Sequence, residues 1–142
     1  MRYHAKLMSI DGRMLATTIN AAPWGQIAVW SVPDGALVKT WAAHPNSASS
    51  SLPSVDALAM SPDGTQLASS GRDRTIKIWS WPDGALVKTI ADVTVGVNSL
   101  HFSPDGSQLA GLATAADVQY CYRLWSVAEG TQLAFTASAT DA

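Results

Sequence analysis

The sequence predicts an all-β fold built from three copies of one unit of four short strands. The first observation is an internal repeat: SIDGRMLAT begins at Ser9, SPDGTQLAS at Ser61 and SPDGSQLAG at Ser103. A second motif follows each copy, and it begins at a tryptophan, namely Trp30, Trp79 or Trp125. A repeat of fixed order indicates one supersecondary unit copied along the chain.

The middle copy shows how one unit divides into strands. Short apolar or alternating runs predict four of them: Val55–Met60, Gln66–Ser70, Thr75–Trp79 and Ala85–Ile90. Turn residues separate these runs, with Pro-Asp-Gly at positions 62–64 and 82–84 and Gly-Arg-Asp-Arg at 71–74. No segment combines a helical period with a capping box and a stop signal, which excludes a sizeable helix.

The same register extends the prediction to the other two copies. It places strands near 3–8, 15–18, 26–30 and 36–41, and near 96–102, 108–113, 121–125 and 131–136. The whole chain, 1–142, is then one domain with repeats at about 2–41, 55–90 and 96–136. Residues 45–53 (PNSASSSLP) form a polar insertion, interpreted as a surface loop, with a regulatory or binding loop as the alternative. Residues 114–118 form a longer, Ala-rich turn in the third copy.

Composition limits the classes of partner. The 142 residues are 47% hydrophobic, which excludes a disordered chain, and only 14% charged, which indicates a surface that faces protein. The net charge of −2 without a basic patch argues against nucleic acid. No stretch approaches the ~20 apolar residues of a membrane span. The first residues lack the apolar core of a signal peptide, so we expect a cytoplasmic protein.

The sequence offers no catalytic or metal-binding pattern. Asp11, Asp63 and Asp105 occupy equivalent turns, and turn formation explains all three better than catalysis. The three histidines lack metal-ligand spacing, and Cys121 is the single cysteine, which excludes an internal disulfide. No nucleophile elbow, phosphate loop or dinucleotide fingerprint occurs. We therefore expect no enzyme activity, no cofactor and no metal.

These motifs resemble the WD-repeat family of β-propellers. The SPDG turn, the LAS of the second strand, the Asp of the tight turn and the TIKIW strand all match, most strongly from Val55 to Ile90. The chain departs from the family pattern where Trp-Asp becomes Trp-Ser in every copy and Gly-His becomes Ala43-His44. The resemblance implies a β-propeller segment of three four-stranded antiparallel blades, an incomplete ring.

The resemblance also implies a structural network. In the family it links a His before the first strand, a Ser or Thr of the second strand, the tight-turn Asp and the third-strand Trp. In the middle copy these residues are His44, Ser69 (or the neighbouring Ser70), Asp73 and Trp79. Such a set would satisfy buried polar groups between strands.

A partner-binding face is implied as well. In the family, partners commonly meet the loops between the second and third strands and between the fourth and first strands. Here that face would carry Trp24, Arg72, Arg74 and the loop around His44–Leu52. Trp and Arg are typical interface anchors. The alternatives are that Trp24 packs inside a distorted blade, and that both arginines are merely solvated.

The expected function is a non-catalytic scaffold that binds a protein or peptide partner. The alternative is a fragment of a longer chain, an enzyme or sensor, whose propeller part is regulatory or ligand-binding. Because propellers close rings of typically 4–8 blades, three blades leave three alternatives open. The chain is part of a longer propeller, or two copies self-associate into a six-bladed ring, or a partner chain supplies the rest.

Overall fold

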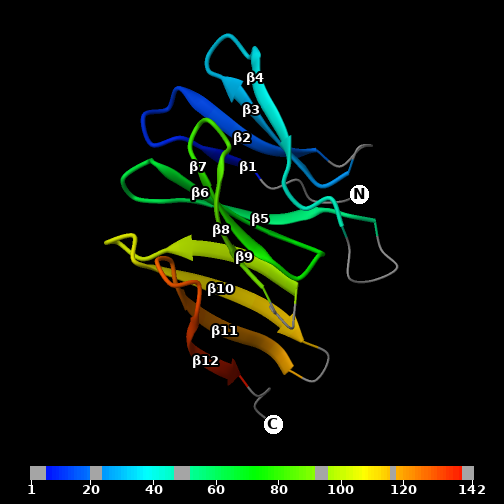
Figure 1. The fold of residues 1–142 in the computed structure, drawn as a ribbon, viewed down its shortest axis with the longest axis vertical. Helices are drawn as coiled ribbons and strands as arrows, with labels where there is room; N and C mark the ends of the chain where they lie inside the picture. Colours follow the sequence, from blue (N-terminus) through cyan, green and yellow to red (C-terminus); the bar gives the residue numbers. More distant parts are fainter. Residues whose placement is uncertain (1–5, 20–23, 47–51, 92–95, 116–117, 139–142) are drawn as a thin grey trace.

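The computed structural model describes residues 6–19, 24–46, 52–91, 96–115 and 118–138. They form three four-stranded antiparallel sheets in chain order (Figure 1). Blade 1 comprises β1 (Lys6–Met8), β2 (Met14–Ile19), β3 (Gln26–Ser31) and β4 (Leu37–Ala42). Blade 2 comprises β5 (Val55–Met60), β6 (Gln66–Gly71), β7 (Ile76–Ser80) and β8 (Leu86–Ile90). Blade 3 comprises β9 (Gly96–Phe102), β10 (Gln108–Ala115), β11 (Val118–Ser126) and β12 (Gln132–Ser138). No helix able to cross a membrane occurs in this part of the chain.

The predicted all-β class with three four-stranded sheets is confirmed, and one detail is wrong. Residues 114, 115 and 118 of the predicted Ala-rich turn belong to strands, because β10 continues to Ala115 and β11 begins at Val118. Ala115 pairs with Val118, and a shift in register between Ala113 and Ala115 takes up the additional residue. A bulge of this kind lets a hairpin lengthen without a larger loop. Residues 3–5 of the first predicted strand lie outside the described residues, as do 47–51 of the polar insertion.

In each blade, a Ser-x-Asp-Gly turn joins the first and second strands and determines where this hairpin forms. In blade 2 the Ser61 hydroxyl donates to Asp63 Oδ1 over 2.6 Å, and the backbone N–H of Thr65 donates to the same oxygen over 3.0 Å. Gly64 adopts a φ of +74°, which glycine tolerates without strain. Equivalent Ser–Asp bonds of 2.7 and 2.6 Å occur at Asp11 and Asp105.

These turn carboxylates predict an acid-dependent loss of stability. The Ser103 hydroxyl, followed by the N–H and hydroxyl of Ser107, lowers the pKa of Asp105 to about 2, and the same kind of bonds lower the pKa of Asp11 and Asp63. Because the folded pKa is below the unfolded value of about 3.9, the stabilisation is complete above that pH and disappears as the pH falls toward 2.

Urea unfolding between pH 5 and pH 2 measures this effect. We expect the free energy of unfolding to fall steeply below about pH 4 in the wild type, since that is where the turn carboxylates begin to bind protons. The triple variant Asp11→Asn/Asp63→Asn/Asp105→Asn is expected to show a shallower decline. Equal slopes in the two proteins would contradict this assignment.

The core lies between the blades. Along β6 and β7, alternate side chains point to opposite sides of the sheet. Leu67 and Trp79 pack against Ala16 and Ile27 of blade 1, in a cluster that Trp41 also joins. We call this layer the 1–2 seam. The rings of Trp41 and Trp79 lie 5.7 Å apart between centroids, so both contribute to the packing of this layer.

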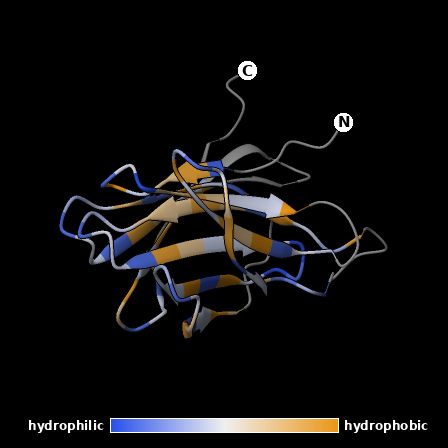
Figure 2. Ribbon diagram, turned by 90° about the horizontal axis from the view of Figure 1, so that it is seen from above, coloured by the Kyte–Doolittle hydropathy of each residue, from blue (hydrophilic) through white to orange (hydrophobic). Residues whose placement is uncertain are grey.

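The opposite side of blade 2 forms the second layer. Ala68 and Ile78 pack against Leu109 and Trp125 of blade 3, which defines the 2–3 seam. Hydrophobic segments lie along the strands, whereas most of the described loops are hydrophilic (Figure 2). Burial of apolar area between neighbouring sheets is therefore the main stabilising term, at about 25 cal/mol per Å².

Candidate functional site

His44 lies in the β4–β5 connection, where the chain passes from blade 1 to blade 2. The carbonyl oxygen of Gly25 accepts hydrogen bonds from the backbone N–H groups of Ala43 and His44, each over 2.9 Å. Gly25 has a φ of +75°, and a Cβ there would stand 2.0 Å from the carbonyl oxygen of His44. Only glycine permits this close approach, so Gly25 fixes the position of His44 against blade 1.

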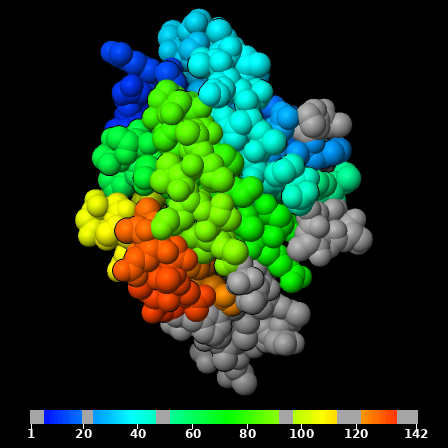
Figure 3. Space-filling view, viewed as in Figure 1, coloured from blue at the N-terminus to red at the C-terminus, as the bar shows by residue number. Residues whose placement is uncertain are grey.

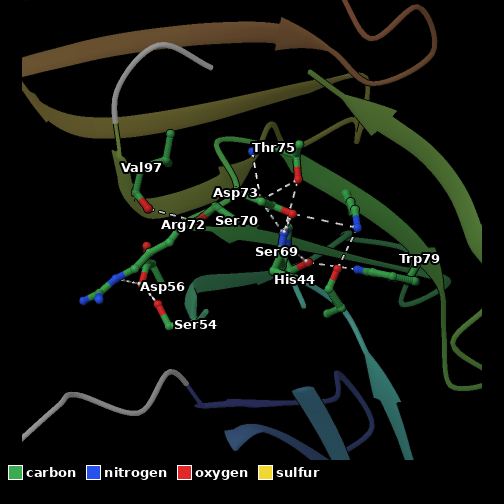
Figure 4. Close-up of polar contacts among 12 residues, drawn as sticks. His44, Ser54, Asp56, Ser69, Ser70, Arg72, Asp73, Thr75, Trp79 and Val97 are labelled. Carbon is green, nitrogen blue, oxygen red and sulfur yellow. Dashed lines mark hydrogen bonds and ion pairs between the residues drawn. The ribbon is translucent and has the colours of Figure 1, made fainter. Parts of the chain in front are cut away.

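The side chain of His44 is fully buried and reaches into blade 2 (Figure 4). Its Nδ1 lies 2.9 Å from Asp73 Oδ1, and its Nε2 lies 2.8 Å from Ser69 Oγ. The indole Nε1–H of Trp79 donates to Ser69 Oγ over 2.9 Å. With a proton on Nδ1, the chain of bonds runs from Trp79 through Ser69 and His44 to Asp73, and every donor has an acceptor.

The structure thus brings together the four residues that the resemblance implied. Ser69, the first of the two serines considered, holds the place in the network. Ser70 points to the other side of β6 and donates to the carbonyl oxygen of Val97 in blade 3 over 2.9 Å. Strand alternation decides between them, because adjacent residues face opposite seams.

Three further residues complete the site, and sequence reasoning did not assign them to it. Gly71 faces the imidazole so closely that a Cβ would stand 2.3 Å from His44 Cγ. The Thr75 hydroxyl donates to Asp73 Oδ1 over 2.8 Å. Lys77 Nζ donates to the carbonyl oxygen of Ala43 over 2.8 Å and lies 3.9 Å from Asp73 Oδ2. The tight turn Gly-Arg-Asp-Arg-Thr was the sequence signal that could have drawn attention to Gly71 and Thr75.

The Asp73 carboxylate is stabilised in its charged form. Burial raises its pKa, but the hydrogen bond and attraction from His44, together with the hydroxyl and N–H of Thr75, outweigh burial and leave the pKa below its usual range. A partly buried carboxylate with this many donors acts as a fixed acceptor for the tight turn and for the histidine.

The order Ser–His–Asp also occurs in nucleophilic catalysis, where the serine must reach a substrate carbonyl. Here Ser69 and His44 are both fully buried, and Ser69 Oγ already accepts the indole N–H of Trp79. A substrate therefore has no access to the nucleophile position. The role of this arrangement is to provide hydrogen-bond partners for buried polar groups. Among the described residues, no group of three or more His, Cys, Asp or Glu could hold a metal ion.

The described residues of the other two blades show parts of this network. In blade 1, Trp30 Nε1 donates to Thr17 Oγ1 over 2.8 Å. In blade 3, Gly111 stands at the register of Ser69, and a Cβ there would lie 2.7 Å from the ring of Trp125. The indole of Trp125 thus occupies the space that a larger residue would need. Within the part of the chain that the structure describes, the full histidine network occurs in blade 2.

The three predicted partner-binding residues lie on the loops that His44 anchors. Trp24 is half-buried and precedes Gly25, the residue that holds the backbone of His44. Arg72 and Arg74 flank Asp73, which forms a hydrogen bond with the His44 ring. Arg72 is partly exposed, with its Nε 4.0 Å from Asp56 Oδ1, and Arg74 is exposed with a φ of 61°.

Comparison with known proteins gives the family of this architecture. The family model described as WD domain, G-beta repeat matches residues 35–80 and 84–117. This chain belongs to the WD40 family. The similar solved structures include the crystal structure of RRP9 WD40 repeats and the structure of U3-55K, each with a TM-score of 0.76 at 24% identity. Each alignment covers 96% of this WD40 chain and 39% of the other chain, so the likeness concerns the fold. No curated protein sequence matches the chain significantly.

Proposed function

We propose that this WD40 chain is a non-catalytic scaffold that binds a protein or peptide on the loops carrying Trp24, Arg72 and Arg74. The observation that supports the proposal is the double role of His44. Its backbone is held by Gly25 beside Trp24, and its ring is held by Asp73 between the two arginines. One buried residue therefore fixes loops of two blades relative to each other.

A fixed loop surface favours binding because less conformational entropy is lost on association. Indole and guanidinium groups are the side chains that most often dominate interface energetics. Guanidinium groups also pair with carboxylates in two parallel hydrogen bonds. The partner that best fits this face is a segment with acidic residues beside an apolar or aromatic one.

Selection from a random peptide library on the immobilised full chain tests this proposal. We expect the wild type to enrich acidic peptides, and the triple variant Trp24→Ala/Arg72→Ala/Arg74→Ala to bind them at least about tenfold more weakly, since each hot-spot residue contributes 1 kcal/mol or more. Circular dichroism should show the same fold in both proteins, because the three side chains lie outside the His44 network.

The matched control removes two other cations and one exposed apolar side chain. The variant Arg13→Ala/Lys39→Ala/Leu86→Ala is expected to bind the selected peptides like the wild type, since all three side chains are exposed and lie on other parts of the blades. Unchanged binding by the Trp24/Arg72/Arg74 variant would remove this face as the binding surface.

A second proposal concerns the whole protein. The chain spans 39% of the two solved WD40 chains to which it is similar. The second proposal is that this chain is part of a longer protein, an enzyme or sensor. The blades would be the regulatory or ligand-binding part of that protein. A reading frame that continues into a catalytic domain would favour this proposal over the simple scaffold.

A further inference from the structure

Both seams inside the chain are built from the same two kinds of sheet face. We call the face that points to the preceding blade the leading face; it carries Leu67 and Trp79 in blade 2, and Leu109 and Trp125 in blade 3. The face that points to the following blade is the trailing face; it carries Ala16 and Ile27 in blade 1, and Ala68 and Ile78 in blade 2. All of these side chains are buried. One packing solution is therefore used twice.

No blade of the described residues packs on the leading face of blade 1. Leu15 pairs with Trp30 across β2 and β3, at the register of Leu67 and Trp79 in blade 2. Whereas Trp79 and Trp125 are 5% and 2% exposed, Trp30 is only partly buried. Leu15, Thr17 and Trp30 line an open apolar pocket of about 440 Å³, together with residues 31–33 and 35. The lining of this pocket is apolar, like the blade faces that pack together in the 1–2 and 2–3 seams.

Likewise, no described blade packs on the trailing face of blade 3. Ala110 pairs with Leu124, at the register of Ala68 and Ile78. Ala68 and Ile78 are fully buried, but Ala110 and Leu124 are only partly so, and Tyr122 on the same face is 57% exposed. None of these side chains is charged. In the space-filling view, blade 2 lies between the other two blades, so only blade 2 has a described blade on both of its faces (Figure 3).

We propose that two copies of this chain associate into one six-bladed ring, with the trailing face of blade 3 of each copy packed on the leading face of blade 1 of the other. The two faces left uncovered are the two halves of the packing that the chain already uses at its 1–2 and 2–3 seams. Six blades fall within the range of closed propellers, and two equivalent contacts make a closed twofold assembly. This inference concerns the ends of the stack and does not depend on the loop face.

The molar mass of the full chain in solution, measured by light scattering after size exclusion, tests this proposal. Two single variants place opposite charges on the two faces: Leu15→Lys on blade 1 and Leu124→Glu on blade 3. The wild type is expected at twice the chain mass of 14.9 kDa, and each variant alone at 14.9 kDa. An equimolar mixture of the two variants is expected to return to twice the chain mass, because one seam is then intact and the other holds a Lys–Glu pair.

The control is Val87→Lys, a 51% exposed apolar residue on β8 of the central blade, which should leave the dimer intact. Should a charged variant lose its β-sheet spectrum, Leu15→Ala and Leu124→Ala replace the pair and should each weaken dimerisation at least tenfold, as the loss of a buried side chain does. The proposal would be overturned by a wild-type mass of 14.9 kDa or by a mass that grows with concentration beyond twice that value. It would also be overturned if both face variants remained dimers. The first of these outcomes would indicate that blades of a different chain cover the faces.

Discussion

Gly71→Ala is expected to lower the free energy of unfolding by about 3 kcal/mol or more, because the added methyl group would overpack the core and disrupt a buried hydrogen-bond network. The new methyl carbon would stand 2.3 Å from Cγ and 2.5 Å from Cβ of His44. Because the imidazole is fully buried and bonded at both nitrogens, it has nowhere to move without losing Asp73 or Ser69. Urea unfolding monitored by tryptophan fluorescence measures this loss.

A double-mutant cycle shows whether the imidazole is the cause. In a His44→Gly background, both carbons that the methyl would meet are absent, so Gly71→Ala should have an effect of less than about 1 kcal/mol. Gly35→Ala is the control, because nothing lies within 4 Å of the added carbon and its φ of +72° alone has a penalty of about 1 kcal/mol. A full effect of Gly71→Ala in the His44→Gly background would contradict the proposed contact.

His44→Ala is expected to lower the free energy of unfolding by about 3 kcal/mol, because several buried partners lose their bonds at once. Asp73 loses one of its donors, and the Ser69 hydroxyl loses its acceptor while it still receives the Trp79 indole N–H. Urea unfolding provides the measurement, and a red shift of the tryptophan emission in the folded variant would report water entering near Trp79.

His101→Ala is the matched control for this substitution. His101 is exposed, and its Nε2 lies 3.2 Å from the Ser99 hydroxyl, so its removal should change stability by less than about 0.5 kcal/mol. If His44→Ala lowered the free energy of unfolding as little as His101→Ala, the network would not stabilise the fold. The proposal that His44 anchors the partner-binding loops would then be wrong as well.

Most of the fold was predictable because its determinants are local. The Ser-x-Asp-Gly turns close through bonds between residues two to five positions apart, as at Ser61, Asp63 and Gln66. Each turn fixes where one strand ends and the next begins, so the strand register follows from the sequence. The bulge between Ala113 and Ala115 was missed because pairing partners, and not local turn residues, determine whether a strand continues.

The site was only partly predictable because its determinants are tertiary. His44, Asp73 and Trp79 could be named from the family resemblance, but the sequence left Ser69 and Ser70 open. Which of two adjacent residues faces a given seam depends on register, and a shift of one residue reverses it. The sequence predicted Gly71 only as a turn residue and gave Gly25 no role, because the contacts of both glycines with His44 form only when two blades meet.

The measurement that tests the central claim most directly is a methyl nuclear Overhauser spectrum of the isotopically labelled chain. The claim is that consecutive blades stack face to face through the 1–2 and 2–3 seams. It predicts cross-peaks between the methyl groups of Ile27 and Leu67, and between those of Ile78 and Leu109, since each pair shares one buried cluster. Absence of both sets of cross-peaks in a folded sample would contradict the stacking of the blades.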